Sequence, residues 1–318
     1  MRLKRLILMA VGAALIAVGF AVPSQASLTT FCNGVASDVT VPGDLVVRAG
    51  ASCELTNVTI NGNATVRADA NLLLDDSTVQ GNLRVNADGF ASLVDSHVAG
   101  NTRLVGAYGV YSEGSVHELN VVATDSEFFY TLGADLQRNV TSTNAETFLE
   151  ESWVSRNVTS EGSYLTDLHD SVVEGNVSVT GAELGSVVCL SEIDGDASFT
   201  GNTGLVQIGA NGPVQDCGFN VFGGDLTLTG NQADSFVSNN VIRGDLVCSD
   251  NSPAPVVSDN RIRGAENCDT SAAAALSSRS SRALATAAAD RKDEVLDAIE
   301  AKVADGEKAA AEAGPAFE

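Results

Sequence analysis

The sequence predicts an all-β protein, a right-handed parallel β-helix (β-solenoid) of about 12 coils, followed by a C-terminal α-helix. Three observations predict it. A segment reading Val/Ile-x-Gly-Asn/Asp-Leu/Val recurs through the chain. Apolar and polar residues alternate after each copy. The six cysteines are spaced by about one repeat.

Residues 1–26 have the features of a secretory signal peptide. A basic start, Arg2 to Arg5, precedes an apolar stretch from Leu6 to Val22, and Ser24-Gln25-Ala26 is a small-x-small cleavage signal. The apolar stretch is shorter than the ~20 residues that span a bilayer. We therefore expect a secreted, extracellular protein without a membrane attachment after cleavage.

The repeat aligns a column of Asn and Asp residues. Clear copies are Val79-Gln-Gly-Asn-Leu83 and Ile242-Arg-Gly-Asp-Leu246. The full column is Asp44, Asn63, Asn82, Asn101, Asn120, Asn139, Asn157, Asn176, Asp196, Asp225 and Asp245. Its members recur with a period of about 19 residues, and only the step from Asp196 to Asp225 is much longer. This period, with β-branched residues and no helical pattern, is typical of one solenoid coil, in which each strand pairs with the same strand of the next coil.

The residues that follow the column alternate between apolar and polar. In one coil Leu83 and Val85 flank Arg84, and in another Val140 and Ser142 flank Thr141. This period of two separates an inner from an outer face. A Gly precedes eight of the eleven column residues and suggests a corner with positive φ, whereas Leu119, Arg138 and Arg156 occupy this position in the degenerate copies. The column itself is interpreted as a structural ladder of stacked side chains. The alternative is calcium binding, which needs several carboxylates converging on one point.

The cysteines test the register independently. No Cys-x-x-Cys pair is present, which disfavours a zinc site, and paired cysteines in an exported chain favour disulfides. The first two cysteines are about one coil apart, as are the last two, and the middle two span the one long step of the column. The predicted disulfides are Cys32–Cys53, Cys189–Cys217 and Cys248–Cys268.

The C-terminal part has a different composition. The solenoid is predicted over residues 27–269, a Ser/Ala/Arg-rich linker over 270–283, and an amphipathic helix with a tail over 284–318. Val295, Ile299 and Val303 recur at four-residue spacing. Such a helix either caps an open solenoid end or extends into solvent. The alternative is a partner-binding or oligomerising helix.

Charge and motifs narrow the functional classes. The formal net charge is −23, and −26 without Arg2, Lys4 and Arg5, so nucleic acid and anionic membranes are not expected partners. His97, His117 and His169 do not share a column, so neither a metal site nor a cofactor is predicted. No catalytic motif is found, and no catalytic residue is assigned.

Aromatic residues cluster in the middle coils, surrounded by acids. Their Phe residues are expected to point inward. Four Tyr residues form a candidate ligand strip for sugar rings or a protein, namely Tyr108, Tyr111, Tyr130 and Tyr164. The alternative is a widened core that large side chains fill.

The chain resembles two groups of repeat proteins. Asn240 to Cys248, Pro253-Ala-Pro255 and Asn260 to Cys268 are similar to exported actinobacterial repeat proteins that are largely uncharacterised. The Gly-Asn/Asp-Leu/Val repeat over residues 38–268 also resembles bactofilins, which polymerise end to end. Both resemblances imply a β-solenoid, and neither implies a catalytic residue.

The main hypothesis is a secreted, non-enzymatic structural or surface-binding protein, whose partner is a glycan, a surface protein or another copy of itself. One alternative is a polysaccharide-active lyase or hydrolase of the parallel β-helix type. Only the turn around residues 205–220 is enlarged, so a walled cleft is not expected. The other alternative is an end-to-end polymer.

Overall fold

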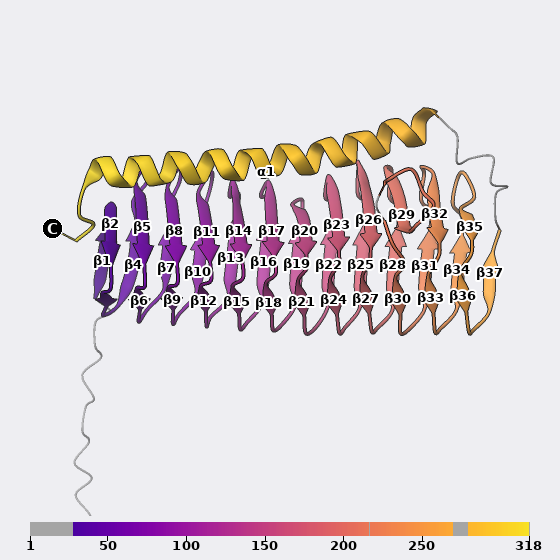
Figure 1. Ribbon diagram of the computed structural model, residues 1–318, viewed down its shortest axis with the longest axis horizontal. Helices are drawn as coiled ribbons and strands as arrows, with labels where there is room; N and C mark the ends of the chain where they lie inside the picture. The colour runs from indigo at the N-terminus through magenta and orange to yellow at the C-terminus, as the bar shows by residue number, and fades with distance from the viewer. Residues whose placement is uncertain (1–27, 216, 270–278, 318) are drawn as a thin grey trace, which may run out of the picture.

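The computed structural model describes residues 28–215, 217–269 and 279–317. The predicted signal peptide lies outside the described residues. The described chain forms a parallel β-solenoid of about 13 turns with one long helix beside it (Figure 1). The predicted fold class is therefore confirmed, with two more strands in its 13-stranded sheet than the eleven residues of the Asn/Asp column, because β1 (Thr29–Cys32) precedes Asp44 and β37 (Glu266–Cys268) follows the coil of Asp245.

Each coil contributes short strands to three parallel sheets, here named A, B and C. Sheet A contains β1 (Thr29–Cys32), β4 (Asp44–Val47), β7 (Ala64–Val66), β10 (Leu83–Val85), β13 (Thr102–Val105), β16 (Val121–Thr124), β19 (Val140–Thr143), β22 (Val158–Glu161), β25 (Val177–Thr180), β28 (Ala197–Thr200), β31 (Leu226–Thr229), β34 (Leu246–Ser249) and β37 (Glu266–Cys268). Sheet B contains β2 (Gly34–Ser37), β5 (Ser52–Thr56), β8 (Asn71–Asp75), β11 (Phe90–Val94), β14 (Gly109–Glu113), β17 (Phe128–Leu132), β20 (Glu146–Glu150), β23 (Leu165–His169), β26 (Gly185–Cys189), β29 (Leu205–Gly209), β32 (Ser235–Ser238) and β35 (Val256–Ser258). Sheet C contains β3 (Thr40–Val41), β6 (Thr59–Ile60), β9 (Thr78–Val79), β12 (His97–Val98), β15 (Val116–His117), β18 (Asp135–Leu136), β21 (Trp153–Val154), β24 (Val172–Val173), β27 (Glu192–Ile193), β30 (Val221–Phe222), β33 (Val241–Ile242) and β36 (Arg261–Ile262).

The register places equivalent residues of successive coils above one another. Leu83 of β10 pairs with Ala64 of β7 on one side and with Thr102 of β13 on the other. The inward side chains form one continuous core along the solenoid. Leu83 and Val85 are fully buried, and each such side chain contributes about 1.5–3 kcal/mol by leaving water.

The Asn/Asp column is a hydrogen-bonded ladder at the corner before sheet A. The Oδ1 atom of Asn63 accepts bonds from the backbone N and from Nδ2 of Asn82, both at 2.9 Å. The expected positive φ of the preceding glycines is wrong, since Gly81 is not among the positive-φ residues. Gly81 is required for close stacking instead, because a Cβ there would lie 2.7 Å from the carbonyl oxygen of Gly62.

The three predicted disulfides are present. Their Cα–Cα distances are 5.6 Å for Cys32–Cys53, 4.9 Å for Cys189–Cys217 and 4.5 Å for Cys248–Cys268. The first and the last of these bridges tie the two terminal coils to the body of the solenoid.

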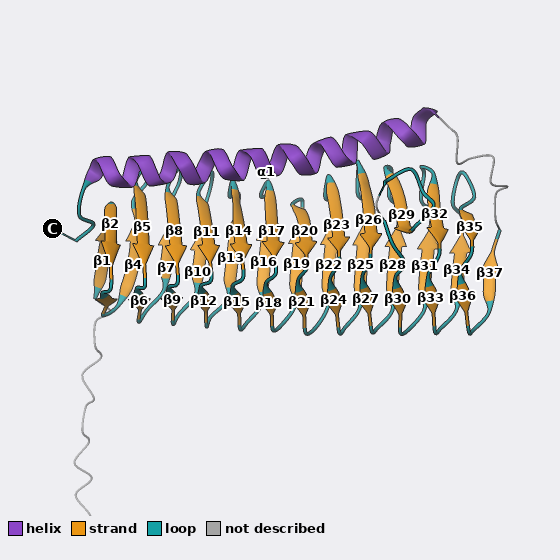
Figure 2. Cartoon of the chain, in the orientation of Figure 1, coloured by secondary structure: helices purple, strands orange, loops and turns teal. Residues whose placement is uncertain are grey.

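Helix α1 (Arg279–Ala313) runs along the outer face of sheet B, from the last coils back to the first (Figure 2). It begins inside the segment predicted as linker, so that prediction is wrong for residues 279–283. The helix neither extends into solvent nor leaves its apolar stripe open, because Val295 and Ile299 are buried against sheet B. In the part of the chain that is described, no helix is long and apolar enough to cross a membrane.

Candidate functional site

The predicted tyrosine strip lies largely beneath helix α1. Tyr130 is 0% exposed, and Tyr108 and Tyr111 are half-buried against the same apolar cluster, whereas Tyr164 is 47% exposed. The prediction of an exposed strip is therefore wrong for Tyr130, and α1 partly covers two of the other three. Tyr108, Tyr111 and Tyr130 thus pack in the apolar cluster between sheet B and α1, where they attach the helix, and Tyr164 is not part of that cluster.

The phenylalanines of this region are also placed differently from the expectation. Phe129 points into the solenoid, but Phe90, Phe128 and Phe148 point outward and pack under α1. Tyr130 stacks on Phe148 with ring centroids 5.2 Å apart. The aromatic residues thus form a second core between sheet and helix, instead of a widened solenoid core.

Charged groups hold the middle of α1 in place. Arg291 donates from Nε and a terminal nitrogen to the buried carboxylate of Glu146, with a shortest distance of 2.7 Å. Lys292 pairs with Glu150, which also accepts the hydroxyl of Tyr130. Burial raises the pKa of Glu146, and the hydrogen bonds from Arg291 oppose this shift. Glu146 and Glu150 are therefore paired with side chains of α1.

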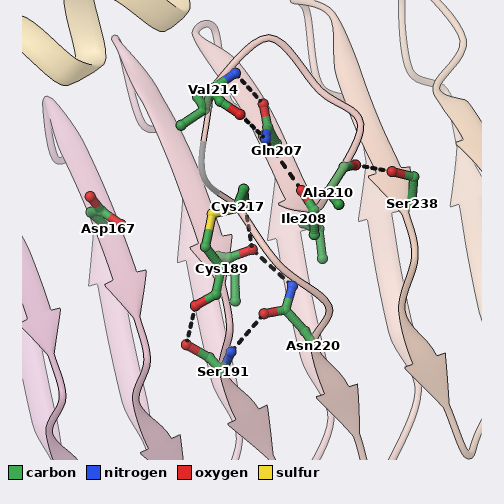
Figure 3. The surroundings of a disulfide bond; sticks show 12 residues. Asp167, Cys189, Ser191, Gln207, Ile208, Ala210, Val214, Cys217, Asn220 and Ser238 are labelled. Carbon is green, nitrogen blue, oxygen red and sulfur yellow. Dashed lines mark hydrogen bonds between the residues drawn. A yellow bond between two sulfur atoms is a disulfide. The ribbon is translucent and has the colours of Figure 1, made fainter.

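The enlarged turn lies on the same side of the solenoid, next to α1 (Figure 3). Gln207 holds it through Val214, donating to its carbonyl at 3.0 Å and accepting its backbone N–H at 2.8 Å. The disulfide Cys189–Cys217 and a bond from Asn220 Nδ2 to the carbonyl of Val188 fix its end. The enlarged turn therefore does not form the side of a cleft on the outer face of sheet A.

An open groove runs along sheet A, beside the ladder. It has a volume of about 870 Å³ and crosses eight successive strands, from β1 to β22. One side is the Asn/Asp column, and the floor is the row of outward side chains of sheet A. Its lining is Thr29, Asp44, Val46, Asn63, Thr65, Asn82, Leu83, Arg84, Asn101, Arg103, Asn120, Val122, Asn139, Thr141, Asn157 and Thr159.

The groove differs in charge from the rest of the chain. Its lining holds two arginines and one carboxylate, that of Asp44, although the whole sequence has 41 acidic and 18 basic residues. Asp44 Oδ1 accepts two bonds from Asn63, at 2.8 and 3.0 Å. Arg84 is steadied by a bond from Nε to Asn86 Oδ1 at 2.8 Å.

The two arginines of the groove are neighbours. Arg84 and Arg103 are register partners on β10 and β13, so their outward side chains start one strand spacing apart, at about 4.8 Å. Like charges in this position repel each other, and an anion between them relieves the repulsion. The sequence alternation placed both on the outer face, but it did not single them out as site residues.

The three histidines are not brought together. His97 Nε2 lies 2.9 Å from Glu118, His169 lies on sheet B, and His117 is buried inside the solenoid between Thr102 and Ser112. Burial, with a smaller contribution from His97, lowers the pKa of His117 to about 4. Among the described residues, no group of three or more His, Cys, Asp or Glu side chains is placed to hold a metal ion.

Comparisons with protein-family models, with curated proteins and with solved structures gave no match for this chain.

Proposed function

We propose that this chain is a secreted, non-enzymatic β-solenoid protein that binds an extended acidic glycan along the groove of sheet A. The observation that carries the proposal is the arginine pair, Arg84 and Arg103, at the middle of a long groove that is otherwise lined almost entirely by neutral side chains.

The shape of the groove favours a polymer over a small molecule. Eight strands at about 4.8 Å spacing give the groove a length of about 34 Å. Its sides repeat from coil to coil, since amides from the ladder and hydroxyls such as those of Thr65 and Thr141 recur along it. A repeating ligand meets the same kind of hydrogen-bonding partner in successive coils.

The charge of the groove favours carboxylates. A guanidinium forms paired hydrogen bonds to a carboxylate, and two guanidiniums one strand apart provide two such positions. The acidic remainder of the surface repels an anionic chain, so binding is directed to the groove. Exposed charges are screened at moderate ionic strength, so we expect the affinity to fall as salt is added.

Retention on immobilised glycans tests the proposal. The mature protein should be retained on polygalacturonate and not on a neutral glucan, and Arg84→Gln/Arg103→Gln should lose retention. The matched control is Arg243→Gln/Arg263→Gln, which removes two exposed arginines that are also one coil apart but lie outside the groove. Equal loss in both double variants, or no retention of the wild type, would contradict the proposal. Shortening of the polymer during incubation would contradict its non-enzymatic part.

A further inference from the structure

The C-terminal tail adds to sheet B at the first coil. Val35 of β2 donates its backbone N–H to the carbonyl of Gly314 at 2.9 Å, and its own carbonyl accepts the N–H of Ala316 at 3.0 Å. The resulting bridge between Val35 and Pro315 is parallel. The tail therefore runs along the edge of β2 in the direction that a strand of a preceding coil would take.

The tail also closes the core at this end. Ala316 is 8% exposed and belongs to the apolar cluster inside the solenoid. Gly34 has a φ of 125°, and a Cβ there would lie 2.1 Å from the carbonyl oxygen of Gly314. The first coil thus has a glycine where the tail approaches most closely.

Helix α1 runs the length of the solenoid and ends next to β2, where the tail begins. At its start, Ser281 is bonded to Asp234, which precedes β32 near the far end of the solenoid. The helix has 35 residues, which at 1.5 Å per residue gives about 52 Å, close to the length of the solenoid. Gly314, with a φ of 83°, ends the helix and turns Pro315 onto β2.

The end face around the tail is unusually apolar. The exposed large hydrophobic side chains here are Leu28, Phe31, Val35, Val39 and Phe317, which are half of those found among the described residues. Without the tail, the apolar side chains of the first coil would adjoin an unpaired strand edge, and this combination favours association. At the opposite end, no described strand pairs with the outer edge of β35, and Val257 and Ile262 are only partly buried.

We propose that residues 314–317 are a capping strand that prevents a second copy of this chain from adding to the first coil. A second copy is the occupant that fits this edge, because its last coil offers parallel strands in the same three-sheet cross-section. With the tail in place, the outward N–H and carbonyl of Val35 are occupied, and end-to-end stacking is blocked. The inference is independent of the groove on sheet A.

The test compares the mass in solution of the mature chain with that of two uncapped variants. One variant ends at Ala313, and the other carries Ala316→Asp, which places a carboxylate in the core position and expels the tail from a full-length chain. The control is Ala313→Asp, an exposed helix residue next to the tail. Sedimentation velocity is run over a series of protein concentrations, with circular dichroism to verify that helix and sheet are retained.

We expect the wild type and Ala313→Asp to remain monomeric, and both uncapped variants to form species beyond the dimer as concentration rises. Adding Val35→Pro to the shortened chain removes the outward N–H and should abolish the association. If the shortened chain does not fold, the sedimentation of the full-length Ala316→Asp variant alone tests the inference. Folded uncapped variants that stay monomeric would overturn the inference, as would association of the wild type to the same extent or association that survives Val35→Pro.

Discussion

Arg84 of β10 and Arg103 of β13 are register partners on neighbouring strands, and both side chains face the groove of sheet A. Two like charges in such a position destabilise a sheet. An anionic ligand bound between the two guanidiniums would offset this repulsion, and Asp44 is the single carboxylate in the lining of this groove.

Replacement of one guanidinium should separate stability from binding. We expect Arg103→Gln to leave the free energy of unfolding unchanged or to raise it by about 0.2–1 kcal/mol at low salt, because the repulsion from Arg84 is removed. The same variant should bind acidic glycan more weakly. Chemical denaturation and glycan binding measured side by side test this. A clear loss of stability would mean that Arg103 has a structural role.

The ladder depends on its acceptors more than on its donors. Asn82 Oδ1 accepts the backbone N–H of Asn101 at 2.8 Å. Asn82→Ala should therefore cost about 1 kcal/mol, because that N–H loses its partner. Asn82→Asp keeps the acceptor, as Asp196 and Asp225 do in other coils, and should cost less. It should also weaken acidic-glycan binding, since it adds a negative charge to the groove. Equal stability of the two variants would contradict the ladder as described.

The pair between Arg291 and Glu146 should hold α1 on sheet B. Arg291→Met leaves the buried carboxylate of Glu146 without a cation, and we expect a loss of about 3 kcal/mol, because Arg291 itself is partly exposed. Hydrogen exchange should become faster in α1 before it does so in the solenoid. Glu294→Gln is the control, because Glu294 is 68% exposed and lies 3.4 Å from the same arginine. An equal effect of both substitutions would argue against the buried pair.

His117 should make the fold sensitive to acid. Its pKa in the folded chain is about 4, below the ordinary value of 6.5. The unfolded chain therefore binds a proton as pH falls below 6.5, whereas the folded chain does so only near pH 4. Stability is lost across this window, by up to about 3 kcal/mol. The raised pKa values of Glu146 and Asp167 act in the opposite direction, so the comparison with a variant is essential.

His117→Leu should remove this loss, since Val98 and Leu136 occupy the same position in the neighbouring coils. His97→Gln, on a partly exposed residue of sheet C, should retain it. Thermal melts between pH 4 and pH 7 measure the difference. A variant His117→Leu that loses as much stability as the wild type would contradict the assignment to this residue.

The sequence was sufficient to predict the register but not the docking of the helix. The repeat period and the cysteine spacings both follow from contacts between adjacent coils. Helix α1 is held by contacts such as Arg291 with Glu146, 145 residues apart, for which the repeat contains no signal. In β17, Phe128, Phe129 and Tyr130 are all apolar or aromatic, so alternation could not tell which of them face outward.

The groove was partly foreseeable. Alternation placed Arg84 and Arg103 on the outer face of sheet A, but the hollow beside the ladder arises from the corner geometry of successive coils. The tyrosines were interpreted as an exposed strip because the stripe of Val295 and Ile299 was not matched to them, whereas the structure places that stripe in the same apolar cluster.

The most direct test of the central claim is calorimetric binding of oligogalacturonates of increasing length at low salt. If the ligand lies along the groove, affinity should rise with length until the oligomer spans about 34 Å and then level off. Arg84→Gln/Arg103→Gln should lose most of this affinity, and neutral oligomers of equal length should not bind. An affinity that does not depend on length, or that is unchanged in the double variant, would contradict the groove as the binding site.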